Sequence, residues 1–210
     1  MVRKVYQGPD AQARCRREAG ALTTLAGRLP VAPVLSRDET SLTMGFLPGG
    51  PGQDLIAAGL AGPVLAACGR MLRQVHAVAA ALVDPAAQPP PPGQPAQVLV
   101  HGDYGPNNTL FSPDGEVVTG VVDWEWAHAG APVEDLAWCE WIVRMHHPAE
   151  VAALDGFYRS YGNRPAWPDR QQAMTSRCRD MLDLCQRWEP GGAAVARWQD
   201  RLRITAAWAE

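Results

Sequence analysis

Short apolar runs and one longer helical pattern alternate over the first 46 residues. Residues 2–7 (VRKVYQ) are typical of a short strand. A helix is predicted from about residue 10 to 28, because apolar residues recur there at helical spacing: Ala13, Ala21, Leu22 and Leu25. Residues 31–35 and 41–47 flank a polar turn and predict a hairpin. The expected order is therefore strand, helix, strand, strand.

The pattern changes after residue 46. Residues 47–52 (LPGGPG) predict a flexible joint, and residues 62–83 predict an amphipathic helix with apolar positions spaced by three and four. The proline-rich residues 85–95 predict a semi-rigid surface connection. Three strands are then predicted, at 97–100, 109–112 and 116–124, followed by four helices, at 132–146, 149–162, 168–188 and 192–208.

Composition narrows the class of protein. The chain has 210 residues, 47% of them apolar, which is enough for one sizeable core. Its formal charge of -3 lacks the basic excess that attracts nucleic acid or an anionic membrane, and no apolar run is long enough to span a bilayer. The five cysteines are odd in number and far apart, as in a reducing compartment. We expect a cytoplasmic protein with neither nucleic acid nor membrane as a partner.

Charge is distributed unevenly along the chain. Lys4 is the only lysine, and no Lys or Arg occurs between Arg73 and Arg144. That interval contains many carboxylates, of which some are simply solvated. So many carboxylates without cations favour a bound metal or a cationic ligand.

The most informative residues are three polar positions at strand ends. Asp103 follows a short apolar strand, Asn108 lies five residues later, and Asp123 ends another strand. Amide and carboxylate oxygens suit magnesium, and Asp103 is placed to accept a proton from a hydroxyl. Each aspartate alone also fits a simpler role, a turn cap at Asp103 or a strand end at Asp123. Their common spacing favours the phosphoryl-transfer pattern.

These motifs resemble the aminoglycoside phosphotransferases and their kinase-like relatives. The segment HGDYGPNN (101–108) resembles the catalytic signature of that family, and VVDWEWAHAGAPVEDLA (121–137) resembles its metal-site strand and the helix that follows. The resemblance covers about residues 2 to 145. It implies that Asp103 is the catalytic carboxylate and that Asn108 and Asp123 bind magnesium.

The resemblance also assigns residues outside the two motifs. It implies that Lys4 holds the phosphates of ATP or GTP, that Glu18 holds Lys4, and that the nucleotide base contacts the backbone near Gly45 and Leu47. Without the family, Lys4 could be a solvated strand residue, and Glu18 could pair with Arg14.

Two further sets of residues complete the expected site. His101 is expected to organise the catalytic loop, and Asp135 to brace it, although Asp135 also fits a helix cap. The expected acceptor pocket lies beyond the metal strand, where side chains could equally pack in the core, face solvent or pair with arginines of the final helices. Its residues are Glu125, Trp126, His128, Glu134 and Glu140.

The resemblance implies an α+β, protein-kinase-like bilobal fold. Only three residues precede Lys4, so we expect a truncated N-terminal lobe (1–46) that lacks the glycine-rich hairpin, with an open sheet edge that could form a homodimer. A mostly helical C-terminal lobe (47–210) would follow. The implied activity moves the γ-phosphoryl group of ATP or GTP to a hydroxyl of a small molecule, either a cationic one such as an aminoglycoside or another metabolite. The alternative is a non-catalytic nucleotide-binding or scaffold protein of the same fold.

Overall fold

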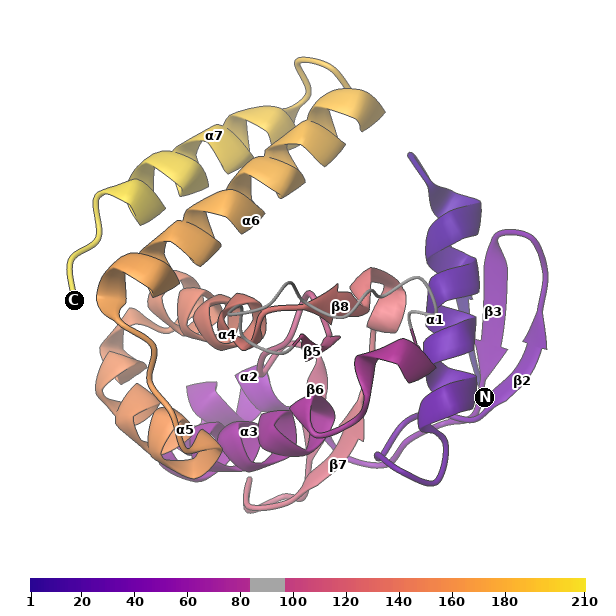
Figure 1. Ribbon diagram of the computed structural model, residues 1–210, viewed down its shortest axis with the longest axis horizontal. Helices are drawn as coiled ribbons and strands as arrows, with labels where there is room; N and C mark the ends of the chain where they lie inside the picture. The colour runs from indigo at the N-terminus through magenta and orange to yellow at the C-terminus, as the bar shows by residue number, and fades with distance from the viewer. Residues whose placement is uncertain (84–96) are drawn as a thin grey trace.

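The structure of the protein is a computed structural model that describes residues 1–83 and 97–210 (Figure 1). The proline-rich connection predicted at 85–95 lies outside the described residues. Within the two described ranges, every helix is too short or too polar to cross a bilayer.

The N-terminal segment forms a small antiparallel sheet with one helix beside it. Strands β1 (Val2–Val5), β2 (Val34–Arg37) and β3 (Ser41–Met44) pair in the order β1-β3-β2, and Lys4 lies opposite Leu42. Helix α1 (Ala11–Leu25) contacts β2 and β3 and buries its apolar face there. The predicted order of strand, helix, strand, strand is confirmed. Strand β2 begins later than expected because the proline at position 33 has no N–H for a ladder hydrogen bond.

The segment predicted as a joint is tied to a second sheet. Strand β4 (Gly50–Pro51) pairs with β6 (Thr109–Phe111), which pairs with β7 (Val118–Val121). Gly49 precedes β4 with a φ of 129°, and a Cβ at this position would lie 2.9 Å from the carbonyl oxygen of Phe111. Only glycine tolerates both the left-handed backbone and this close approach.

Helices α2 (Gly52–Ala57) and α3 (Ala61–His76) follow the joint. The helix predicted to reach residue 83 ends earlier, because Ala79 adopts an extended backbone (φ −61°, ψ 121°) that separates α3 from the short 3-10 helix η1 (Ala80–Leu82). Strands β5 (Val98–Val100) and β8 (His128–Gly130) form a two-stranded antiparallel ladder, and the 3-10 helix η2 (Trp124–Trp126) precedes β8.

The C-terminal part is helical, as predicted. Helices α4 (Pro132–His146), α6 (Trp167–Trp188) and α7 (Ala193–Ala206) lie within two residues of their predicted bounds. The helix predicted at 149–162 divides into the 3-10 helix η3 (Pro148–Ala153) and α5 (Leu154–Tyr161). Helices α6 and α7 lie side by side, and α6 contacts α4 (Figure 1).

Two apolar clusters hold these elements together. The larger joins α1, the sheets, α3 and α5, with Leu22, Leu72 and Phe111 among its buried members. The smaller lies between α4, α6 and α7, where the rings of Trp138 and Trp141 stack with centroids 4.3 Å apart. Residues 101–108 contact both clusters, because Tyr104 belongs to the first and Asp103 is hydrogen bonded to Trp138 of the second.

Candidate active site

Asp103 is held by hydrogen bonds to both of its carboxylate oxygens. Asn108 Nδ2 donates to Asp103 Oδ2 and to the Asp103 carbonyl oxygen, each at 2.8 Å. Trp138 Nε1, from α4, donates to Asp103 Oδ1 at 2.6 Å. The structure therefore brings Asp103 and Asn108 together as their spacing predicts, and it adds Trp138, which no motif indicated.

Burial raises the pKa of Asp103 above its ordinary value. The hydrogen bond from Trp138 and the nearby His101 and Arg177 oppose this shift, because each favours the ionised carboxylate. A carboxylate whose pKa is raised toward the working pH is a better proton acceptor than an exposed one. This environment suits a general base.

His101 connects the catalytic loop to the end of β7. Its Nε2 lies 3.0 Å from the Val122 carbonyl oxygen, and its Nδ1 accepts the Asp103 N–H at 3.2 Å. Since a carbonyl can only accept, Nε2 carries the proton. Both ring nitrogens are thus engaged in loop contacts, and neither is free to act as a base.

Asp135 braces the same loop from the start of α4. Its carboxylate is fully buried and accepts the backbone N–H groups of His101 at 2.7 Å and Gly102 at 2.9 Å, with His76 Nε2 at 3.1 Å. Burial alone would raise the pKa of Asp135, but the hydrogen bond and charge of His76 outweigh it and lower the pKa. Asp135 therefore contacts the loop directly, beyond any capping of its own helix.

Lys4 joins α1 to the end of β7. Its Nζ lies 2.6 Å from both Glu18 Oε2 and Asp123 Oδ1. Burial opposes the charge of Lys4, but Asp123 and Glu18 outweigh it and raise the pKa of Lys4. Arg14 pairs with Glu125 at 2.8 Å, so the alternative pairing of Glu18 with Arg14 is not found.

Glu18 is further fixed by two donors besides Lys4. The Tyr6 hydroxyl donates to Oε2, and the Trp124 N–H donates to Oε1 at 3.2 Å. Asp123, next to Trp124, has a left-handed backbone with φ 69°. This conformation costs a non-glycine residue about 1–2 kcal/mol and is concentrated at functional sites.

A cavity of about 450 Å³ lies between the first sheet and the β6–β7 sheet. Its polar lining includes Lys4, Glu18, Asn108 and Asp123, and Lys4 contacts both Glu18 and Asp123. Its apolar lining includes Leu22, Ala32, Met44, Gly45, Leu47, Leu110 and Val121. A cavity with both kinds of lining suits a nucleotide, which has a charged part and a flat, less polar base.

The polar lining residues also fit a magnesium ion. Asn108 and Asp123 line the same cavity as Lys4, and their amide and carboxylate oxygens are hard ligands of the kind magnesium prefers. The apolar residues Leu22, Ala32, Leu110 and Val121 had no sequence signal, because they resemble ordinary core positions.

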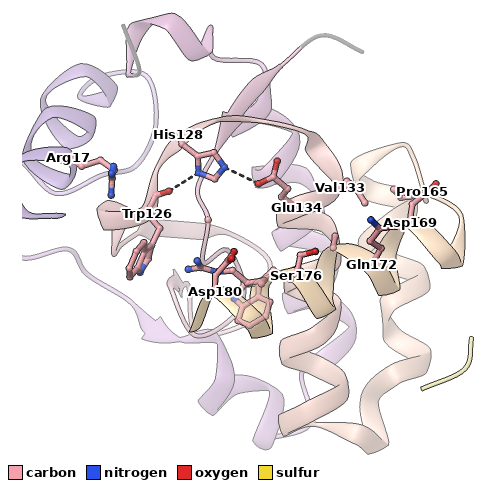
Figure 2. A pocket seen from close by; sticks show the side chains of 14 residues that line it. Arg17, Trp126, His128, Val133, Glu134, Pro165, Asp169, Gln172, Ser176 and Asp180 are labelled. Atoms are coloured by element: carbon pink, nitrogen blue, oxygen red, sulfur yellow. Dashed lines mark hydrogen bonds and ion pairs between the residues drawn. The ribbon is translucent and has the colours of Figure 1, made fainter. Parts of the chain in front are cut away.

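A second cavity of about 740 Å³ lies beside Gly102, between η2, α4 and α6. Three of the residues predicted for the acceptor pocket line it: Trp126, His128 and Glu134. Figure 2 shows His128 between the Trp126 carbonyl oxygen and the Glu134 carboxylate, with its ring nitrogens 2.9 Å from each. The hydrogen bond to Glu134 raises the pKa of His128, although burial opposes the shift.

Two residues predicted for the acceptor pocket lie elsewhere. The Glu125 carboxylate faces Arg14 and lies 3.8 Å from Lys4. Glu140 is fully buried, where it pairs with Arg144 at 2.8 Å and Arg170 at 2.6 Å. The alternative reading of Glu140, pairing with an arginine of the final helices, is therefore the one found.

The second cavity contains charges of both signs. Glu134, Asp169 and Asp180 are acidic, whereas Arg17 and Arg177 are basic. The interval without basic residues favours a cationic ligand, but α1 and α6 bring Arg17 and Arg177 into this cavity from outside that interval. The distribution of charge along the chain does not show which charged side chains lie together, because that depends on how distant segments pack.

Comparison with known proteins matches the region of sequence that contains both motifs, 101–108 and 121–137. Residues 83–173 match the model of a family described as the phosphotransferase enzyme family. Curated relatives match over shorter stretches. Acyl-CoA dehydrogenase family member 10 of Mus musculus is 35% identical over 66 residues, and family member 11 of Gallus gallus is 40% identical over 48 residues. These stretches are 31% and 23% of this chain, and each is only 6% of the relative.

Solved structures match over nearly the whole chain. The macrolide 2′-phosphotransferase MphH from Brachybacterium faecium has a TM-score of 0.65 at 20% identity, over 99% of this chain and 85% of that one. The GDP and kanamycin complex of an APH(2″) enzyme has a TM-score of 0.74 at 11% identity, over 98% and 86%. The resemblance read from the motifs is thus confirmed: residues 83–173 match the phosphotransferase enzyme family, and the chain has the α+β, kinase-like fold of aminoglycoside and macrolide phosphotransferases.

Proposed function

We propose that the protein transfers the γ-phosphoryl group of ATP or GTP to a hydroxyl group of a small molecule. One observation carries this proposal: Asp103 is hydrogen bonded to one residue from each cavity. Asn108 lines the cavity that suits a nucleotide, and Trp138 lines the cavity beside Gly102. A proton acceptor placed between a nucleotide and an acceptor is what phosphoryl transfer requires.

The chain's own residues supply binding, orientation and proton transfer. Asp103 takes the proton of the acceptor hydroxyl while the hydroxyl oxygen bonds to the γ-phosphorus. The bond between that phosphorus and the β–γ bridging oxygen breaks at the same time. The products are a phosphate ester and the nucleoside diphosphate. Lys4 offers positive charge to the phosphates, and Asn108 and Asp123 would hold magnesium. When bound, the ion neutralises charge on the phosphate oxygens.

Neighbours of known structure support the choice of nucleotide class. Aminoglycoside phosphotransferases of this fold were solved with GDP and with ATP. The apolar lining of the first cavity includes Gly45 and Leu47, the positions that the resemblance assigns to the nucleotide base. The alternative, a non-catalytic nucleotide-binding protein, is favoured by one contact only: Lys4 Nζ lies directly on Asp123 Oδ1, a proposed metal ligand.

A screen separates these two functions. Metabolites and antibiotics with hydroxyl groups are incubated with ATP or GTP and magnesium, and nucleotide consumption is measured. We expect consumption that depends on one acceptor class. Nucleotide binding without consumption on any acceptor would favour the non-catalytic alternative.

The metal site has its own test. Magnesium is titrated into wild-type protein and Asp123→Ala with nucleotide present, and binding is followed by calorimetry. We expect much weaker metal-dependent nucleotide binding in the variant, because Asp123 provides a charged oxygen ligand. Asp114→Ala is a matched control, since this carboxylate is exposed in the turn before β7. Equal responses of Asp123→Ala and wild type would place the metal elsewhere.

A further inference from the structure

Arg177 lies between the proposed acceptor cavity and Asp103. It comes from α6 and lines the 740 Å³ cavity together with Gly102 and Trp138. It also lines a smaller space of about 180 Å³ whose walls include Asp103. An acceptor that presents its hydroxyl to Asp103 would therefore have this guanidinium beside it.

Aromatic rings hold the Arg177 guanidinium in place. Its central carbon lies 5.0 Å from the ring centroid of Trp126 and 5.8 Å from that of Trp138. A guanidinium that contacts aromatic rings through its faces keeps its N–H groups pointing outward from its edge. Those edge donors match the two oxygens of a carboxylate or phosphate.

Arg177 and Arg201 are the half-buried arginines of the described residues that have no anionic partner. Arg14, Arg144 and Arg170 each pair with a glutamate. Within the described parts of the chain, Arg177 forms no ion pair, and its buried Nε has no hydrogen-bond partner. A guanidinium on a cavity wall that lacks an anionic partner can form charge-assisted hydrogen bonds with an anionic group of a ligand.

Nearby carboxylates leave this guanidinium free for a ligand. Asp103 and Asp180 are close enough to interact with its charge but do not pair with it. Asp103 instead accepts one hydrogen bond on each carboxylate oxygen, from Trp138 and from Asn108. The guanidinium therefore keeps its hydrogen-bonding capacity at the point where an acceptor would enter.

We propose that Arg177 binds an oxyanion, a carboxylate or a phosphate, that the acceptor carries next to its reacting hydroxyl. This inference rests on the proposed function, because it assumes that the cavity beside Gly102 receives the acceptor. A positively charged group elsewhere on the same acceptor would face Glu134, Asp169 and Asp180. The acceptor class is then a hydroxyl compound with an acidic group, rather than a purely cationic one.

Binding of charge-matched sugars tests the proposal directly. The probes are glucose, glucosamine, glucuronate and glucose 1-phosphate, and affinities are measured by calorimetry or NMR titration at low ionic strength. The proteins are wild type, Arg177→Gln, Arg177→Lys and Arg179→Gln. Arg179 is the control, because it is exposed on the same helix and lines neither cavity. Thermal unfolding of each variant verifies that it is folded.

We expect wild type and Arg179→Gln to bind at least one anionic sugar more tightly than glucose and glucosamine. Comparison of glucuronate with glucose 1-phosphate shows which oxyanion is preferred. The preference should fall roughly tenfold or more in Arg177→Gln, the scale of a lost charge-assisted hydrogen bond, and recover in part in Arg177→Lys. It should also weaken as salt is added.

Any other pattern overturns the proposal. Anionic sugars that bind no better than glucose, or not at all, remove the oxyanion site. A preference that survives in Arg177→Gln moves it to another residue. If Arg177→Gln changes the rate of phosphoryl transfer but not the preference for anionic sugars, Arg177 acts on Asp103 or on the transferred phosphate instead. The proposed function can fail separately, since anion preference without nucleotide consumption would keep the binding site and remove the transfer.

Discussion

The indole N–H of Trp138 donates a hydrogen bond to Asp103, the proposed proton acceptor. This hydrogen bond favours the ionised form of Asp103, whereas burial favours the neutral form and prevails. The balance between the two sets the pH below which Asp103 is protonated and cannot accept a proton.

Trp138→Phe should move the acid limb of activity to higher pH. The variant removes the hydrogen bond to Asp103, so the pKa of Asp103 rises further, and the rate falls at a higher pH than in wild type. The measurement is kcat/KM against pH with the acceptor found by the screen. Trp141→Phe is the control, because Trp141 stacks on the same ring but donates to Thr205. An acid limb that stays in place would show that this bond does not tune the base.

The contribution of Asp135 to the free energy of unfolding depends on pH. Its lowered pKa means that the ionised form stabilises the folded state fully above its ordinary pKa of 3.8, and that this contribution is lost as pH falls below that value. An amide at this position would leave at least one buried N–H of the loop without an acceptor.

Asp135→Asn should lower the free energy of unfolding at neutral pH by about 1–3 kcal/mol. The difference from wild type should shrink as pH falls through 3.8, since wild type then loses the same contribution. Denaturant unfolding at a series of pH values measures it. A difference that is constant with pH would mean that the charge of Asp135 is not what holds the loop.

At the scale of elements, helices α3 and α5 approach each other closely through a glycine. A Cβ on Gly69 would overlap the Phe157 carbonyl oxygen and lie 3.0 Å from the Tyr161 backbone nitrogen. Tyr161 also places its hydroxyl 2.9 Å from His76 Nδ1, at the end of α3. The close approach therefore supports the histidine that contacts Asp135.

Gly69→Ala should destabilise the protein by about 1–3 kcal/mol, because backbone atoms of α5 would have to move. Gly62→Ala is a control in the same helix, since a Cβ there meets nothing within 4 Å. That change should be neutral or stabilising by up to about 1 kcal/mol, because alanine favours helix. Denaturant unfolding compares the two variants. Equal effects would show that the close approach of α3 and α5 is relaxed at little cost.

At the scale of the whole molecule, the sequence predicts what lies close along the chain. The periodicity of α4, α6 and α7 is a local property that agrees with the structure. Local spacing also places Asn108 on Asp103, whereas the roles of Asp103, Asn108 and Asp123 stay predictions. The early end of α3, where Ala79 adopts an extended backbone, has no turn signal in the sequence.

The parts of the site that the sequence does not predict depend on packing between distant segments. Arg177 reaches Trp126 and Trp138 only because α6 lies against α4, and Arg17 enters the same cavity from α1. Glu140 looks like a pocket residue in the interval without cations, yet it pairs with Arg170, thirty residues later in the chain. No spacing rule connects such residues, so the sequence cannot assign them.

Asp103→Asn tests the central claim most directly. Phosphoryl transfer to the acceptor and nucleotide affinity are measured on wild type and on this variant, which keeps the size of the side chain but removes its basicity. We expect nucleotide affinity and folding to be retained, while turnover falls on the order of a hundredfold or more. Turnover equal to that of wild type would contradict the assignment of Asp103 as the proton acceptor between the two cavities.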